Sequence, residues 1–92
     1  MMKRYVIERN LPGIGKWDSS ALQKASVASC DALAQLYGRL QWEHSYVAGD
    51  KTFCIYLADS EGSILDHARL SGFPANKITE TVTVIDPLTA FS

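Results

Sequence analysis

The chain is poor in the residues that mark the most easily recognised protein classes. Its 92 residues include two cysteines, two histidines and three prolines. Cys30 and Cys54 fall in a predicted helix and a predicted strand, without the CxxC spacing of metal or redox motifs. The sequence therefore does not indicate a disulfide framework or a zinc ribbon, and we expect both thiols to be reduced.

Net charge and long apolar runs are scarce as well. The formal net charge is -1 and the pI is near 6.0, which gives no field that attracts nucleic acid or an anionic membrane. No apolar stretch is long enough for a signal peptide or a membrane span. We therefore expect a cytoplasmic protein with neither nucleic acid nor membrane as a partner.

The apolar content is that of one folded domain. Hydrophobic residues make up 47% of the chain and charged residues 21%, which indicates a single domain over residues 1–92. A domain this small leaves part of its apolar sheet surface without a helix to cover it. We expect a second copy to cover that surface, so the predicted assembly is a homodimer.

The predicted elements follow the order β-α-β-β-α-β. Strands are expected over residues 3–9, 40–47, 52–58 and 78–85. One helix is expected over residues 19–37 after an Asp18 cap, and another from Asp59 or Ser60 to residue 70, closed by Gly72. The inward-facing stripe of this second helix is expected at Ile64, Leu65 and Ala68.

Right-handed crossovers turn this order into an α+β ferredoxin-like sandwich. In that fold, a four-stranded antiparallel sheet carries both helices on one face and leaves the other face bare. Two such domains can pair through their bare faces into a dimeric α+β barrel.

The hairpin over residues 40–58 contains most of the reactive side chains, and its turn decides where they point. A three-residue turn at Gly49–Lys51 pairs Tyr46 with Cys54 and His44 with Tyr56. A two-residue turn pairs His44 with Ile55 and is expected to send His44 to the core side. We favour the first register, because it keeps Phe53, Ile55 and Leu57 in an apolar core and spares His44 the cost of desolvation, although it turns Glu43 toward the helices.

In the favoured register, the bare face collects an imidazole, a thiol and aromatic side chains. Its members are Trp42, His44, Tyr46, Cys54 and Tyr56. The opposite set, Val47, Phe53, Ile55 and Leu57, is then directed to the helices. The bare-face cluster is either a mixed aromatic dimer contact or, with His44 and Cys54 as ligands, a site for nickel or another divalent transition metal.

Two further residues outside the hairpin are candidate ligands. His67 lies at the margin of the second helix's inward stripe, either as a packed histidine bonded to a carbonyl or carboxylate or as a ligand or proton donor. Glu8 lies near the end of the first strand, either as a solvated charge or as a carboxylate that completes a metal shell.

Long, scattered segments of the chain resemble a family of small bacterial ferredoxin-like proteins. Mostly described as a domain of unknown function, that family includes nickel-binding members. The segments are residues 4–13, 41–47, 50–56, 67–69, 72–76 and 85–87, which cover the chain nearly from end to end.

The resemblance implies a dimer of ferredoxin-like subunits and, in some members, nickel held by histidine and oxygen ligands. His44, Cys54 and His67 match positions that carry the same residue types in nickel-binding relatives. At Glu8 and Phe73 the relatives place histidines. Phe73 cannot bind a metal, and the Glu8 carboxylate is a harder, anionic replacement.

Two functions follow as hypotheses. The leading one is a non-catalytic, metal-binding homodimer with His44 as principal ligand and Cys54, His67 and Glu8 in support. The alternative is a dimeric α+β barrel protein that binds or converts a small organic molecule, with His44 or His67 and Tyr46 or Tyr56 moving protons. A buried cavity lined by a histidine and a tyrosine would favour the alternative.

Overall fold

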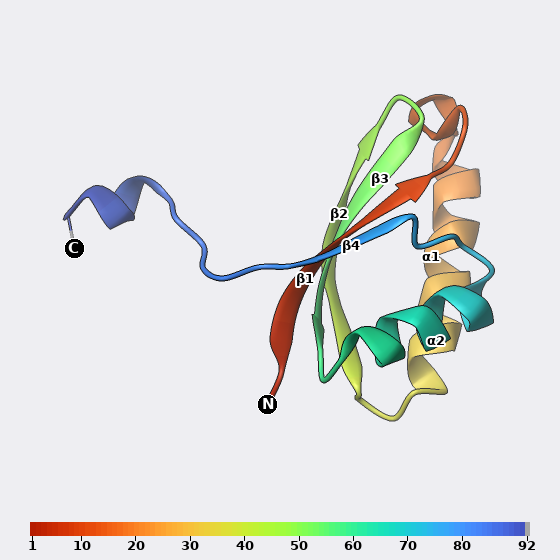
Figure 1. The fold of residues 1–92 in the computed structure, drawn as a ribbon. Coiled ribbons are helices and arrows are strands. Elements are labelled where there is room, and N and C mark those ends of the chain that lie inside the picture. Colours follow the sequence, from red (N-terminus) through yellow and green to blue (C-terminus); the bar gives the residue numbers. More distant parts are fainter. Residues whose placement is uncertain (92) are drawn as a thin grey trace.

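The computed structural model describes residues 1–91 and confirms the predicted order of elements. The strands are β1 (Lys3–Asn10), β2 (Leu40–Ala48), β3 (Lys51–Ala58) and β4 (Lys77–Glu80). The helices are η1 (Ile14–Lys16), α1 (Ser19–Ala34), α2 (Glu61–Ser71) and η2 (Pro87–Phe91). The strands pair antiparallel in the order β2-β3-β1-β4, and α1 and α2 lie on the same side of the sheet (Figure 1). This is the predicted ferredoxin-like sandwich.

The predicted capping residues mark the starts of α1 and α2 correctly. The Asp18 carboxylate accepts a hydrogen bond from the N–H of Ala21 at 2.8 Å, and the Ser60 hydroxyl accepts one from the N–H of Ser63 at 3.3 Å. Gly72 ends α2 with a φ of 81°, a conformation that a residue without Cβ adopts freely. The end of α1 was predicted too late, because the chain turns after Ala34 and reaches positive φ at Tyr37.

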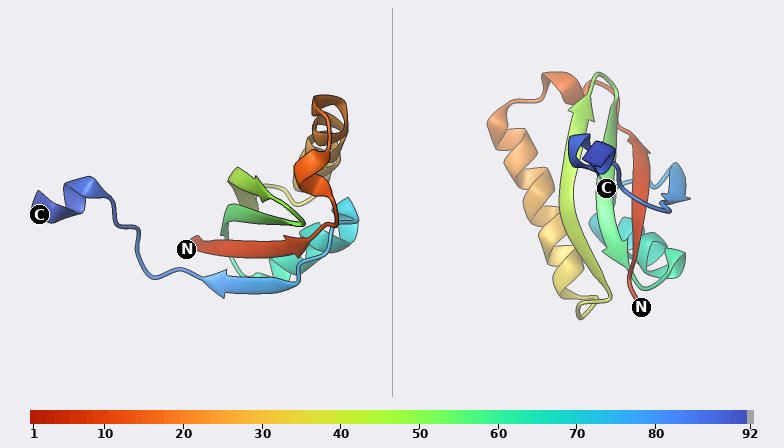
Figure 2. Two further views of the ribbon diagram at one scale, coloured as in Figure 1. Left: turned by 90° about the horizontal axis from the view of Figure 1, so that it is seen from above. Right: turned by 90° about the vertical axis from the view of Figure 1, so that its left-hand side faces the viewer.

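The last strand is shorter than the predicted 78–85. β4 ends at Glu80, which pairs with Tyr5, and the Thr81 N–H still donates to the Arg4 carbonyl at 2.9 Å. Because β1 begins at Lys3, the residues after Thr81 find almost no neighbouring backbone to pair with. The chain instead leaves the sheet on the side opposite the helices (Figures 1 and 2).

The core lies between the sheet and the helices. Most of its residues come from alternate positions of the two central strands, namely Tyr5, Ile7, Cys54, Tyr56 and Ala58. Leu40 of β2, Leu36 and Ile64 complete it. The expected stripe of α2 is correct for Ile64 but wrong for Leu65, which is 55% exposed while Ser63 and His67 are buried.

The favoured hairpin register is wrong. Ala48 pairs with Lys51, so Gly49 and Asp50 alone form the turn, and His44 pairs with Ile55. The faces of β3 are also the reverse of the expectation: Cys54 and Tyr56 point to the helices, and the set Phe53, Ile55 and Leu57 lies on the open face, half-buried. The two-residue turn therefore leaves His44 exposed beside Ile55 instead of sending it to the core.

A bulge in β2 separates two side chains that were expected together. Between Trp42, opposite Tyr56, and His44, opposite Ile55, β2 advances two residues while β3 advances one. This irregularity reverses the alternation of faces, so Trp42 points to the helix side and His44 to the open face. Glu43 in the bulge does not face the helices, since its carboxylate accepts from Arg4 Nε at 2.7 Å.

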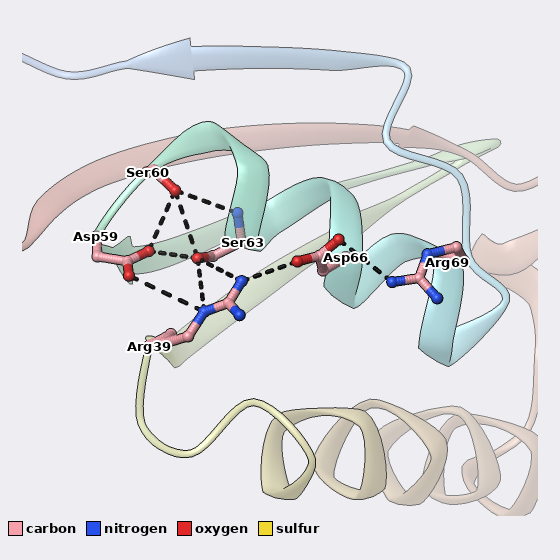
Figure 3. Close-up of polar contacts among 6 residues, drawn as sticks. All are labelled: Arg39, Asp59, Ser60, Ser63, Asp66 and Arg69. Carbon is pink, nitrogen blue, oxygen red and sulfur yellow. Dashed lines mark hydrogen bonds and ion pairs between the residues drawn. The ribbon is translucent and has the colours of Figure 1, made fainter.

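A polar cluster fixes the start of α2 against the beginning of β2 (Figure 3). Arg39 donates to the Ser63 hydroxyl at 3.2 Å through Nε and to the Asp66 carboxylate at 2.8 Å through Nη2. The Ser63 hydroxyl in turn donates to the Asp59 carboxylate. These contacts hold the helix that carries His67. No helix within residues 1–91 has the length and apolar content needed to cross a membrane.

Candidate functional site

A cavity of about 200 Å³ lies between α1, the β1–α1 connection and the helix-facing side of the sheet. Most of its wall is carbon. The apolar side chains around it are Leu11, Ile14, Leu22, Trp42, Val47 and Phe73. The sequence positions Leu22 at the helical spacing that turns α1 toward the sheet, and the bulge turns Trp42 the same way. An apolar recess with a few polar groups is the usual form of a small-molecule site.

Arg9 supplies the charged group of this wall. It follows Tyr5 and Ile7 on the buried side of β1, and it is itself 3% exposed. Its Nη1 donates to the carbonyls of Phe73 at 3.3 Å and Pro74 at 2.9 Å. Its Nη2 is buried and has no hydrogen-bond partner among residues 1–91.

His67, Ser29 and Tyr56 form a buried polar chain beside Arg9. The Ser29 hydroxyl lies 3.2 Å from His67 Nε2 and 3.3 Å from the Tyr56 hydroxyl. His67 Nε2 also lies 3.2 Å from the Ser29 carbonyl, which requires a hydrogen on Nε2 if that carbonyl is to accept. The packed interpretation of His67, a histidine bonded to a carbonyl, is thus confirmed. Its Nδ1 is buried without a partner among the described residues.

Burial favours the neutral forms of the His67 imidazole and the Tyr56 phenol. It lowers the pKa of His67, an effect that the nearby Arg9 charge reinforces and the Ser29 carbonyl opposes. Burial also raises the pKa of the Tyr56 phenol. At neutral pH the cavity therefore presents a neutral imidazole, a protonated phenol and one cation. This set can bind an anionic group or place a proton donor and acceptor near a bound molecule.

The structure divides the predicted metal ligands between the two faces of the sheet. Cys54 and His67 line the cavity, together with the predicted pocket residues Trp42 and Tyr56. His44 and Glu8 belong to the open face, opposite Ile55 and Phe53 of β3. The expectation that His44 and Cys54 project together is therefore wrong, because they lie on opposite sides of one strand pair.

The open face carries a histidine and a tyrosine next to each other on β2. His44 Nε2 lies 3.2 Å from the Tyr46 hydroxyl, and the rings meet edge to face with centroids 5.1 Å apart. Glu8 is already engaged by Lys51 at 3.2 Å and Lys77 at 3.9 Å. In the described part of the chain, no group of three or more His, Cys, Asp or Glu side chains is placed to hold a metal ion.

Sequence reasoning assigned no role in the site to Arg9 or Ser29. A signal for Arg9 was present, since Tyr5, Ile7 and Arg9 alternate along one strand face and an arginine in phase with buried residues must be desolvated. The bulge at Glu43, which turns Trp42 toward the cavity, leaves no clear mark in the sequence.

These observations define a class: small α+β proteins of ferredoxin-like fold with a mostly apolar cavity under one sheet face and an uncovered opposite face. The chain belongs to the family described as nickel responsive protein SCO4226-like, whose model matches residues 5–81. The match spans β1 through Thr81 and stops where the chain leaves the sheet. Family membership and fold thus agree with the resemblance read from the sequence.

A solved structure supports the same architecture. The crystal structure of SCO4226 from Streptomyces coelicolor A3(2) superposes with a TM-score of 0.74 at 15% sequence identity, covering 89% of this chain and 99% of that chain. At this identity the likeness establishes the fold alone. None of the curated proteins compared with the chain matches it.

Proposed function

We propose that this protein is a non-catalytic, cytoplasmic homodimer that binds a divalent transition metal, nickel first, at the contact between two open sheet faces. The description of its family as nickel responsive carries this proposal. His44 is the principal ligand, because its imidazole is exposed on the open face while His67 is 1% exposed under the helices. Neutral imidazole is a preferred ligand of nickel, copper and zinc.

The open face supports pairing with a second copy. Val6, Ile55 and Leu57 lie there half-buried, in a row that no helix of the described chain covers. The tail after Thr81 extends from the same side of the sheet and exposes Val82 and Phe91. A contact between two such faces buries both sets of apolar side chains, which water otherwise surrounds.

Pairing also addresses the shortage of ligands. Each copy brings His44, with the Tyr46 hydroxyl beside it. Glu8 is a weaker candidate, since two lysine ammonium groups must leave it before it binds a cation. His67 and Cys54 lie behind the sheet in this arrangement and contribute no ligand.

Calorimetric titration with nickel tests the proposal. The wild type is expected to give a saturable heat with one nickel ion for two chains, and His44→Ala is expected to remove it. His67→Gln is the matched control, because it deletes the buried imidazole and should leave the heat unchanged. Equal heats from wild type and His44→Ala, or no heat from either, would remove the metal proposal.

The cavity favours a second candidate function, the binding or conversion of a small organic molecule. Its wall holds a neutral histidine and a protonated tyrosine, the pair that can accept and donate a proton. Deuterium exchange at the carbon beside the carbonyl of a small ketone, followed by NMR, tests for conversion. Exchange that is equally fast with His67→Gln would exclude His67 as the base.

A further inference from the structure

Arg9 is a buried cation without a counter-ion. It is 3% exposed, and among residues 1–91 no carboxylate forms an ion pair with it. Carbonyl groups satisfy Nη1, while Nη2 remains unbonded although it is shielded from water by the protein. A desolvated guanidinium is strongly unfavourable unless an anion or a full set of acceptors compensates it. The Tyr56 ring, whose centroid lies 6.0 Å from the guanidinium carbon, offsets part of this cost, and an acceptor for Nη2 would offset more of it.

The space beside Arg9 suits a small apolar body. At about 200 Å³ the cavity equals roughly six or seven water volumes, which accommodates a molecule of about ten non-hydrogen atoms. Leu22 and Ala25 form its wall on α1, and the Trp42 indole forms its wall on the sheet. The Trp42 N–H is already satisfied by Ser45 at 2.9 Å, so the indole offers its carbon surface to an occupant.

We propose that this cavity binds a small organic acid, with its carboxylate on Arg9 and its aromatic or branched aliphatic body between α1 and Trp42. The inference rests on the second candidate function and is independent of the metal proposal. A carboxylate matches one guanidinium in charge and shape. A phosphate group at neutral pH carries more negative charge than the single cation lining this cavity neutralises, and a metal cation is repelled by Arg9.

Tryptophan fluorescence provides the direct measurement. In a Trp17→Phe background, Trp42 is the remaining indole, and it lines the cavity. Phenylacetate is expected to change its emission saturably. Phenylacetamide, which has the same ring and no charge, is expected to bind at least about tenfold more weakly, because a hydrogen bond to a charged group contributes that much or more. Inorganic phosphate at equal concentration is expected to leave phenylacetate bound.

Variants assign the effect to the cavity. Arg9→Met should reduce phenylacetate affinity at least about tenfold, whereas Arg69→Met, which removes an exposed arginine from α2, should leave it unchanged. Ala25→Leu fills the cavity from α1, keeps Arg9 in place and should abolish binding. This variant and the amide comparison decide the question if Arg9→Met does not fold.

Two outcomes separate this inference from the pocket function on which it rests. Equal affinity for phenylacetate and phenylacetamide, both lost with Ala25→Leu, would retain a small-molecule pocket and overturn the organic acid. Absence of binding for both ligands, measured by fluorescence and calorimetry, would overturn both. Displacement of phenylacetate by phosphate would overturn the role given to the apolar body.

Discussion

Burial of His67 predicts a specific loss of stability in mild acid. The imidazole is 1% exposed, and burial lowers its pKa below the ordinary value of 6.5. The unfolded chain therefore binds a proton at pH values where the folded chain does not. Stability conferred by the neutral ring is complete above the unfolded pKa and falls as the pH drops from there toward the folded pKa.

The size of the effect follows from proton linkage. An unfolded pKa near 6.5 limits the loss between pH 7.5 and pH 5.5 to at most about 1.4 kcal/mol, which is reached when the folded ring binds no proton in this interval. With a urea m-value of roughly 1.5 kcal/mol/M for a small domain, the unfolding midpoint should move by at most about 1 M.

Urea unfolding of wild type and His67→Gln at the two pH values measures this effect. The glutamine amide can still reach a hydrogen-bond partner near Ser29 but does not titrate, so the variant should lose less stability than the wild type over this interval, with a difference of at most about 1.4 kcal/mol. Asp59 and Asp66 do not interfere, because hydrogen bonds from Ser63 and Arg39 hold their pKa values below the usual 3.8. Identical pH dependence of both proteins would refute the argument.

Three further predictions concern the scaffold. Gly15→Ala should destabilise the fold by about 1–3 kcal/mol in thermal unfolding, since its Cβ would lie 3.0 Å from the Gly49 carbonyl oxygen; Gly49→Ala, whose Cβ meets nothing within 4 Å, should not. Ending the chain after Thr81 should lower the dimer fraction in sedimentation without unfolding the sheet, and an unchanged dimer would contradict a role for the tail. Asp66→Asn should reduce the stability lost below about pH 4, because the Arg39 hydrogen bond lowers the pKa of this carboxyl; an unaltered acid limb would count against that contact.

The sequence predicted the element order and the helix starts because those signals are local. Asp18 and Ser60 cap their helices through their own side chains, and Gly72 stops α2 through its backbone conformation. Such features need no knowledge of the rest of the fold. The family resemblance was also legible, since its segments are distributed along the whole chain and the matched region runs from residue 5 to 81.

The faces of the hairpin were not predictable by hydrophobicity, because β3 is apolar on both sides. Thr52, Cys54 and Tyr56 alternate with the more apolar Phe53, Ile55 and Leu57, and the more apolar set seemed the better core. The structure buries the other set, in which the Tyr56 hydroxyl meets Ser29. That partner is supplied by tertiary structure, and with it a buried phenol loses its disadvantage. The bulge beside Trp42 also places Trp42 and His44 on opposite faces of the sheet, whereas both were expected on the open face.

Alternation on β3 separates the two proposed sites. Ile55 faces His44 and the proposed dimer contact, whereas Tyr56 faces the cavity under Arg9. The two sites share no side chain, so their binding energies should be independent. We expect His44→Ala to leave phenylacetate affinity unchanged and Arg9→Met to leave the nickel heat unchanged, with the double variant losing both. A single substitution that altered both affinities would show that the sheet couples its two faces, and the metal and the organic acid would then have to be treated as linked ligands of two coupled sites.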